Sequence, residues 1–126
     1  ARNASDAKKV AQTVANSSLV KSSWNGEDPN WGRIIHAVGY SGASIREEFV
    51  DIYYESKAAC KGGLQAKTNP EVLRNIVSKP EFKITIDLGI GKANHRIYSS
   101  DLSPEYVDFN RSEYAYWKQA KKDGLV

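Results

Sequence analysis

A strict alternation of apolar and polar residues near position 85 constrains the fold of this chain more than any other feature. The alternating residues are Phe82, Lys83, Ile84, Thr85, Ile86, Asp87 and Leu88. Successive side chains of a β-strand point to opposite faces, so this pattern predicts a strand with one buried face. The Gly-Ile-Gly sequence at residues 89–91 then predicts a turn.

Four other segments have the composition of strands. Residues 49–54 are rich in aromatic and β-branched side chains, which favours a strand. Residues 57–65 predict its partner, although Gly62 and Gly63 are equally typical of a turn or a bulge. Residues 96–99 and 106–109 predict further strands.

Four segments show helical signals. Small and apolar residues recur at helical spacing over residues 5–16, with Ser5 or Asp6 placed to cap the first turn. Residues 112–123 predict a terminal helix closed by glycine. The stretch 19–23 is short and reads as extended, and residues 24–27 have the composition of a loop.

Two of the helices begin with a proline signal. Asp28 and Pro29 read as an N-cap followed by proline at the first helical position, where its missing N–H costs nothing. Asn69 and Pro70 open the next helix in the same way, and Pro80 ends it. The predicted apolar face of the first comprises Trp31, Ile34, Ile35 and Val38.

These strands and helices predict an α+β fold, a mixed β-sheet with packed helices. The chain has 126 residues, the length of one domain. Its 18 basic and 15 acidic residues are mixed along the chain, and its apolar runs are too short for a membrane span. We therefore expect no membrane role.

Single residues add little evidence for chemistry. Cys60 is the only cysteine, which excludes an intrachain disulfide and fits a reducing compartment. His36 and His95 lack further ligands at metal-binding spacing, so we expect no metal. The pair Gly89 and Gly91 lacks the third glycine of a nucleotide loop, and a tight strand connection is the better interpretation.

The C-terminal residues leave two interpretations open. Aromatic side chains interleaved with basic ones are typical of single-stranded nucleic-acid binding. Tyr114 and Trp117 are also three apart on the predicted helix, so they can dock on a neighbouring surface while the lysines stay solvated. We favour docking and expect no nucleic-acid partner. The residues concerned are Arg111, Tyr114, Tyr116, Trp117, Lys118, Lys121 and Lys122.

The densest cluster of polar and aromatic residues is the segment 26–33. Glu27 and Asp28 lie close to Arg33, with Asn30 and Trp31 between them. Composition fits a binding loop, and it also fits a helix start whose acids offset the helix dipole. We expect a buried structural turn, with Asp28 capping the helix and Arg33 paired with a carboxylate.

Three blocks of sequence, residues 14–43, 86–93 and 100–110, resemble the ornithine acetyltransferase (glutamate N-acetyltransferase) family. Residues 14–21 (VANSSLVK), 26–35 (GEDPNWGRII) and 37–43 (AVGYSGA) are similar to its ANSPLVK, GEDPNWGRI and AVGxSGA motifs. Residues 86–93 (IDLGIGKA) resemble VDLGxGxA, and residues 100–110 resemble CDLTxxYVxIN. The resemblance covers about residues 7–110, and residues 111–126 form a divergent tail.

The resemblance implies an enzyme of arginine biosynthesis that moves acetyl from N-acetylornithine to glutamate through an acetyl-threonine intermediate. It implies a precursor that cleaves itself before a threonine, giving alpha and beta subunits that form a heterotetramer. This sequence contains no methionine and therefore lacks the Ala-Thr-Met-Leu cleavage motif. We expect the chain to begin inside a longer product, as the C-terminal part of the beta subunit.

The resemblance assigns one site residue here. Asn110 matches an asparagine that contacts the amino-acid substrate, and Ala115 stands where the family has Ser or Thr. We expect no catalytic residue, metal or cofactor in this segment, and the alpha subunit and the rest of the beta subunit as partners. A cytoplasmic location is expected. The alternative is a non-catalytic interaction domain of the same fold.

Overall fold

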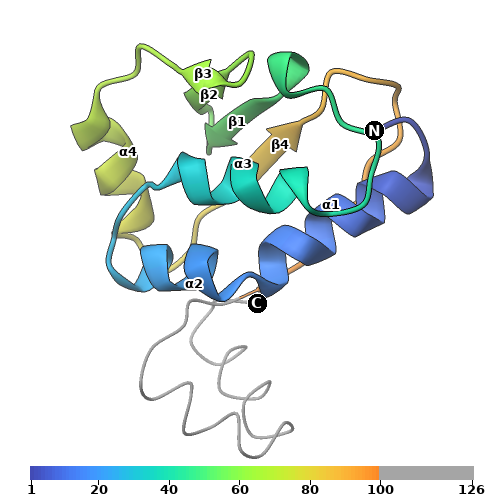
Figure 1. Ribbon diagram of the computed structural model, residues 1–126. Helices are drawn as coiled ribbons and strands as arrows, with labels where there is room; N and C mark the ends of the chain where they lie inside the picture. Colours follow the sequence, from blue (N-terminus) through green and yellow to red (C-terminus); the bar gives the residue numbers. More distant parts are fainter. Residues whose placement is uncertain (100–126) are drawn as a thin grey trace, which may run out of the picture.

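Four helices and an antiparallel sheet dominate the part of the chain that the structure describes. The computed structural model describes residues 1–99 (Figure 1). The class is α+β, as predicted. In chain order the elements are α1 (Ala4–Asn16), α2 (Ser18–Asn25), α3 (Trp31–Gly39), a 3-10 turn (Glu47–Phe49), β1 (Asp51–Tyr54), β2 (Lys57–Lys61), β3 (Leu64–Gln65), α4 (Pro70–Val77) and β4 (Ile84–Asp87).

Side-chain caps set where the first two helices begin. Asn3 caps α1, with its Oδ1 accepting from the Asp6 amide at 2.8 Å, so the predicted cap at Ser5 or Asp6 was wrong. Ser17 caps α2, with its Oγ accepting from the Val20 amide at 3.3 Å. The prediction of an extended segment over 19–23 and a loop from Trp24 was also wrong. Buried Val20 and Ser23 lie three residues apart, which is helical spacing.

Asn30, rather than Asp28, caps α3. The Asn30 Oδ1 accepts from the Arg33 amide at 3.1 Å, while Asp28 is exposed two residues earlier. An N-cap must lie directly before the first helical residue for its side chain to reach the N2 or N3 amide, and only Asn30 meets this condition. The predicted helix face is confirmed, because Ile34 and Val38 are buried.

The sheet has the order β3-β2-β1-β4, and every described pairing is antiparallel. Gly62 and Gly63, at φ 59° and 76°, form the turn between β2 and β3, so residues 57–65 make two strands joined by a turn. The predicted strand near residue 85 is confirmed as β4, which lies at one edge of the sheet. The helix after Asn69 is confirmed as α4, capped by Asn69.

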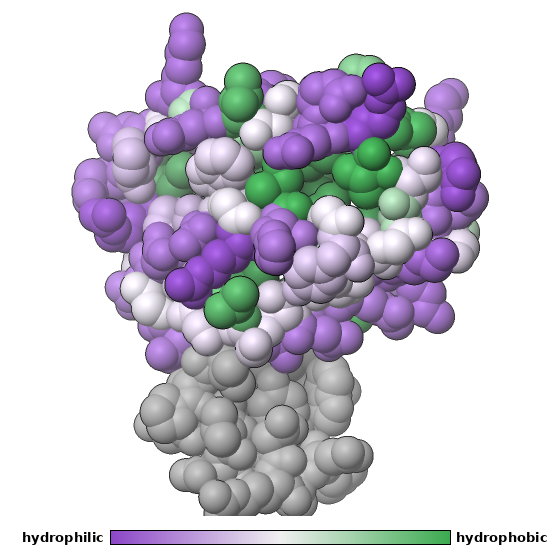
Figure 2. Space-filling model, viewed as in Figure 1, coloured by the Kyte–Doolittle hydropathy of each residue, from purple (hydrophilic) through white to green (hydrophobic). Residues whose placement is uncertain are grey.

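One apolar core joins the sheet to the helices. α3 crosses the sheet in Figure 1, with α1 and α2 along one side and α4 near the end of β1. The core brings Ile34 of α3, Ile52 of β1 and Leu73 of α4 into one cluster. The face that carries α3 is mostly polar outside, with apolar side chains in a recess near its centre (Figure 2).

The predicted strand over residues 96–99 is absent from the described structure. A strand is defined by hydrogen bonds to a neighbour, and within residues 1–99 no backbone group of 96–99 has a backbone partner. The strand-like composition is therefore not matched by a pairing partner in this part of the chain. The predicted strand at 106–109 and helix at 112–123 lie outside the described residues.

Candidate functional site

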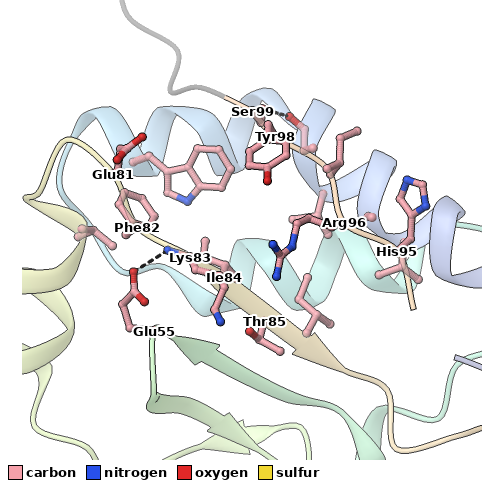
Figure 3. A pocket seen from close by; sticks show the side chains of 18 of the residues that line it. Glu55, Glu81, Phe82, Lys83, Ile84, Thr85, His95, Arg96, Tyr98 and Ser99 are labelled. Atoms are coloured by element: carbon pink, nitrogen blue, oxygen red, sulfur yellow. Dashed lines mark hydrogen bonds between the residues drawn. The ribbon is translucent and has the colours of Figure 1, made fainter. Parts of the chain in front are cut away.

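A groove of about 1200 Å³ separates the free edge of β4 from α1 and residues 93–99. Figure 3 shows β4 on one side and the 95–99 segment on the other, with α1 behind that segment. Its apolar walls contain Val10 and Val14 of α1 and Ile84 and Ile86 of β4. The two isoleucines are only half-buried, so this groove presents a partly open apolar surface.

One end of the groove is closed by two aromatic rings. Trp24 and Phe82 meet edge to face, with their ring centroids 6.0 Å apart. The indole Nε1 of Trp24 is buried and has no hydrogen-bond partner among residues 1–99. A buried donor without an acceptor is rare and costs free energy. This end of the groove therefore lacks, within residues 1–99, a hydrogen-bond acceptor for the indole N–H.

Charged side chains lie around the rim. The Lys83 amide donates to the Glu55 carboxylate at 2.9 Å, which fixes the turn after β1 next to the start of β4. Arg96 points across the groove toward β4, and Tyr98 directs its hydroxyl toward the same space (Figure 3). A guanidinium and a phenol on an apolar groove suit a ligand with carbonyl or carboxylate oxygens.

The described residues do not provide an activated nucleophile in this groove. Thr85 of β4 borders it, but Thr85 is inside a strand and its amine is a peptide nitrogen, which cannot act as base for the hydroxyl. Cys60 is completely buried, and burial raises the pKa of its thiol. A thiol kept protonated inside the core is structural.

Residues 26–30 form a mostly exposed turn between α2 and α3, not the predicted buried one, and residues 31–33 begin α3. Glu27 has a positive φ of 53°, and both Glu27 and Asp28 face solvent. Trp31 packs against the core from a half-buried position, as part of the predicted helix face. Among residues 1–99, Arg33 has no carboxylate partner, contrary to the prediction. Its Nη1 donates to the carbonyl of Leu19 at 2.8 Å, which ties α3 to α2.

The Gly-Ile-Gly sequence after β4 is a tight connection, which confirms the preferred interpretation. Gly89 and Gly91 have φ values of 66° and 68°, a region that glycine occupies without strain. A Cβ on Gly89 would lie 2.8 Å from the carbonyl oxygen of Phe49, and one on Gly91 would lie 2.4 Å from that of Ala1. Close backbone packing therefore explains both glycines.

A buried carboxylate that the sequence analysis missed ties the start of α1 to the loop after α3. Asp6 is 2% exposed and forms an ion pair with Arg2 at 3.1 Å. Its Oδ2 also accepts from the Ser44 amide at 3.2 Å. The helical spacing of Arg2 and Asp6 was a signal for the pair, but the contact with Ser44 needs the tertiary fold.

The remaining candidates are scattered. His36 lies exposed on α3 against Tyr40, with ring centroids 5.3 Å apart, beside a hollow of about 450 Å³. His95 lies on the 93–99 wall of the groove beside β4. Residues 1–99 hold no cluster of three or more metal-ligating side chains, and none of their helices is long and apolar enough to cross a membrane. Asn110 and the basic, aromatic tail lie outside the described residues.

Comparison with known proteins gives a consistent result. The model of the ArgJ family matches residues 1–115. The arginine biosynthesis bifunctional protein ArgJ of Chlorobaculum tepidum is 43% identical over 112 residues, which are 89% of this chain and 28% of that protein. The glutamate N-acetyltransferase of Methanocaldococcus jannaschii is 41% identical over 122 residues, 90% of this chain and 30% of that protein.

The fold also matches a solved structure. The crystal structure of the arginine biosynthesis bifunctional protein argJ from Bacillus halodurans superposes with a TM-score of 0.83 at 33% identity. The match covers 88% of this chain and 53% of that chain. The chain thus spans less than a third of the curated relatives described above.

Proposed function

Because the chain belongs to the ArgJ family, we propose that it is one segment of an enzyme that transfers acetyl from N-acetylornithine to glutamate in arginine biosynthesis. The observation that carries this proposal is the family match over residues 1–115. The names of the relatives, an arginine biosynthesis protein and a glutamate N-acetyltransferase, support the pathway and the transfer of acetyl to glutamate.

Within that enzyme we place the chain in the C-terminal part of the beta subunit, as a scaffold that adds substrate contacts. The support is the lack of an activated nucleophile in residues 1–99, where Thr13, Thr68 and Thr85 are all interior to the chain. The proposed partners are the rest of the beta subunit and an alpha subunit made by self-cleavage, in a cytoplasmic heterotetramer.

The proposed reaction has two steps that share one covalent intermediate. The hydroxyl oxygen of a terminal threonine, deprotonated by its own α-amine, attacks the acetyl carbonyl carbon of N-acetylornithine. The C–N bond breaks, ornithine leaves with the proton, and an acetyl ester remains. The amine of glutamate then attacks the ester carbonyl, which gives N-acetylglutamate and restores the hydroxyl.

The residues of this chain would bind and orient substrate in this scheme. The Asn110 amide donates to a carboxylate and accepts from an ammonium, so it can serve both charges of an amino acid. The Asn110 amide does this without adding a charge to the pocket. This assignment comes from the resemblance of residues 100–110 to the closing motif of the family.

A turnover assay tests the proposed function. The 126-residue chain alone is expected to form no N-acetylglutamate from N-acetylornithine and glutamate, and the assembled enzyme that contains it is expected to do so. An assembled protein that holds together but shows no transfer would contradict the proposal and favour the non-catalytic interaction domain. Turnover by the isolated chain would show that the nucleophile lies within it.

A further inference from the structure

Within residues 1–99, the backbone groups on the outer edge of β4 have no hydrogen-bond partner, and they face the groove. The Glu55 amide donates to the carbonyl of Lys83 at 2.8 Å, which continues the antiparallel register between β1 and β4. Hydrogen-bonded pairs recur at every second residue of such a ladder, so Thr85 also bonds toward β1. The amides and carbonyls of Ile84 and Ile86 consequently point away from β1, toward the groove.

The opposite wall, residues 93–99, is held at both ends and unpaired between them. The amine of Ala1 donates to the carbonyl of Ala93 at 2.9 Å, and the Ala93 amide donates back to Ala1 at 3.1 Å. This two-way exchange is the hydrogen-bonded pair of an antiparallel ladder. At the other end the Ser99 hydroxyl donates to the carbonyl of Ala15 at 2.8 Å. Within residues 1–99, the backbone of 94–98 has no hydrogen-bond partner.

The space between these two edges has the side chains and hydrogen-bonding groups that suit a bound β-strand. Its floor is apolar, from Val10 and Val14 of α1. The side chains of Ile84 and Ile86 are half-exposed on the face of β4 that is buried elsewhere in the sheet. At the closed end, the Trp24 indole N–H has no acceptor among the described residues, and a backbone carbonyl would provide one.

We propose that this groove takes one extended strand, the segment that leads into Ala1 in the full-length enzyme, which completes the sheet between β4 and residues 93–99. The strand runs antiparallel to 93–99, in the register that the Ala1–Ala93 pair begins, and therefore parallel to β4. Its alternate side chains lie against Val10 and Val14. The proposal rests on the proposed function, because it takes the strand from the rest of the same polypeptide.

Strand addition fits these observations better than a small ligand or a docked helix. An extended peptide uses backbone hydrogen bonds on both sides, and this groove offers unpaired backbone groups on both sides. A helix satisfies its own backbone groups and would leave the edges of β4 and 93–99 unpaired. The added strand also explains why residues 96–99 have a strand-like sequence and no strand partner within residues 1–99.

Hydrogen exchange of the 126-residue chain tests the proposal directly. The chain is compared with a variant extended before Ala1 by the ten or so residues that precede the matching region in the Chlorobaculum tepidum relative. We expect the amides of Ile84, Ile86, His95 and Ile97 to exchange at least about tenfold more slowly in the extended variant. The Thr85 amide, already bonded to β1, is the internal reference and should change less.

A matched control replaces alternate residues of the added segment by proline, which cannot donate a ladder hydrogen bond. This control is expected to exchange at the rates of the original chain. The proposal is overturned if the extension leaves the four amides unchanged, or if Ile84 and Ile86 are already as protected as Thr85 in the monomeric 126-residue chain. The latter result would mean that residues 100–126 cover the edge.

A second copy of the chain is a further alternative that the same experiment detects. Protection of Ile84 and Ile86 that rises with protein concentration, together with a dimer in sedimentation equilibrium, would assign the groove to that copy and overturn the proposal. The exchange experiment contains no substrate. Its failure therefore leaves the acetyl-transfer assay unaffected, and a failed transfer assay leaves the exchange result unaffected.

Discussion

Asn30 shows how one residue decides where an element begins. Its side chain caps α3, whereas Asp28 is exposed outside the helix. Replacing Asn30 by Ala is expected to lower the free energy of unfolding by about 1 kcal/mol, the usual loss of an N-cap. Asp28→Ala is the matched control and should cost much less. Urea denaturation measures both, and the account is wrong if the order is reversed.

Gly89 is a second residue whose conformation the fold requires. Its φ is 66°, and an added Cβ would lie 2.8 Å from the backbone oxygen of Phe49. Gly89→Ala is therefore expected to lower the free energy of unfolding by about 1–3 kcal/mol. Gly39→Ala is the control, because nothing lies within 4 Å of a Cβ there. Thermal unfolding should separate the two variants, and an equal effect would refute this explanation.

At the scale of elements, an ion pair holds the start of β1 to the end of β2. Asp51 accepts from the Gly62 amide at 2.9 Å and from Lys61 at 3.1 Å. Burial raises the pKa of Asp51, but the bonds from Gly62 and Lys61 outweigh it and lower the pKa below 3.8. Hydrogen bonds to Tyr53 and Asp51 raise the pKa of Lys61 to about 12.

These shifts predict how stability depends on pH. A carboxyl whose folded pKa is lowered stabilises the fold above its unfolded pKa, and this stabilisation is lost as the pH falls through the folded value. The urea midpoint of the chain should therefore fall below about pH 4, and Asp51→Asn should show a smaller fall. If Asp51→Asn keeps the full acid sensitivity, other carboxyl groups cause it.

Sequence patterns predicted the elements whose signals are local. The alternation around Ile84 and the Asn69-Pro70 start of α4 were both correct, because strand period and proline chemistry act within a few residues. Residues 19–23 were misread because α2, with eight residues, gives too little periodicity to separate a short helix from an extended segment. Residues 96–99 form no strand within residues 1–99, because a strand depends on its partner, which composition does not show.

The candidate site was less predictable than the fold. The groove combines α1, β4 and residues 93–99, and its position follows from tertiary packing rather than from any one motif. The contact of Asp6 with Ser44 and the two bonds between Ala1 and Ala93 link residues far apart in sequence. Residues 26–35 were predicted as a buried turn that leads into a helix, and the helix was correct, but the turn is mostly exposed and its cap is Asn30.

For the whole molecule, Asn110 is the residue that the family resemblance assigns to substrate. Asn110→Ala in the assembled enzyme is expected to raise the KM for N-acetylornithine, because one amide that pairs with both charges of the substrate is lost. Kinetics and urea denaturation are measured on the same preparation. Lower stability with unchanged kinetics would show that Asn110 only caps a turn.

We propose that this chain supports an acetyltransferase whose nucleophile lies outside it. The most direct measurement is peptide mass spectrometry of the assembled enzyme after brief reaction with N-acetylornithine in the absence of glutamate. The account predicts one acetyl group on a terminal threonine outside residues 1–126, which disappears when glutamate is added. An acetyl group on Thr13, Thr68, Thr85 or Cys60, removed in the same way by glutamate, would contradict it.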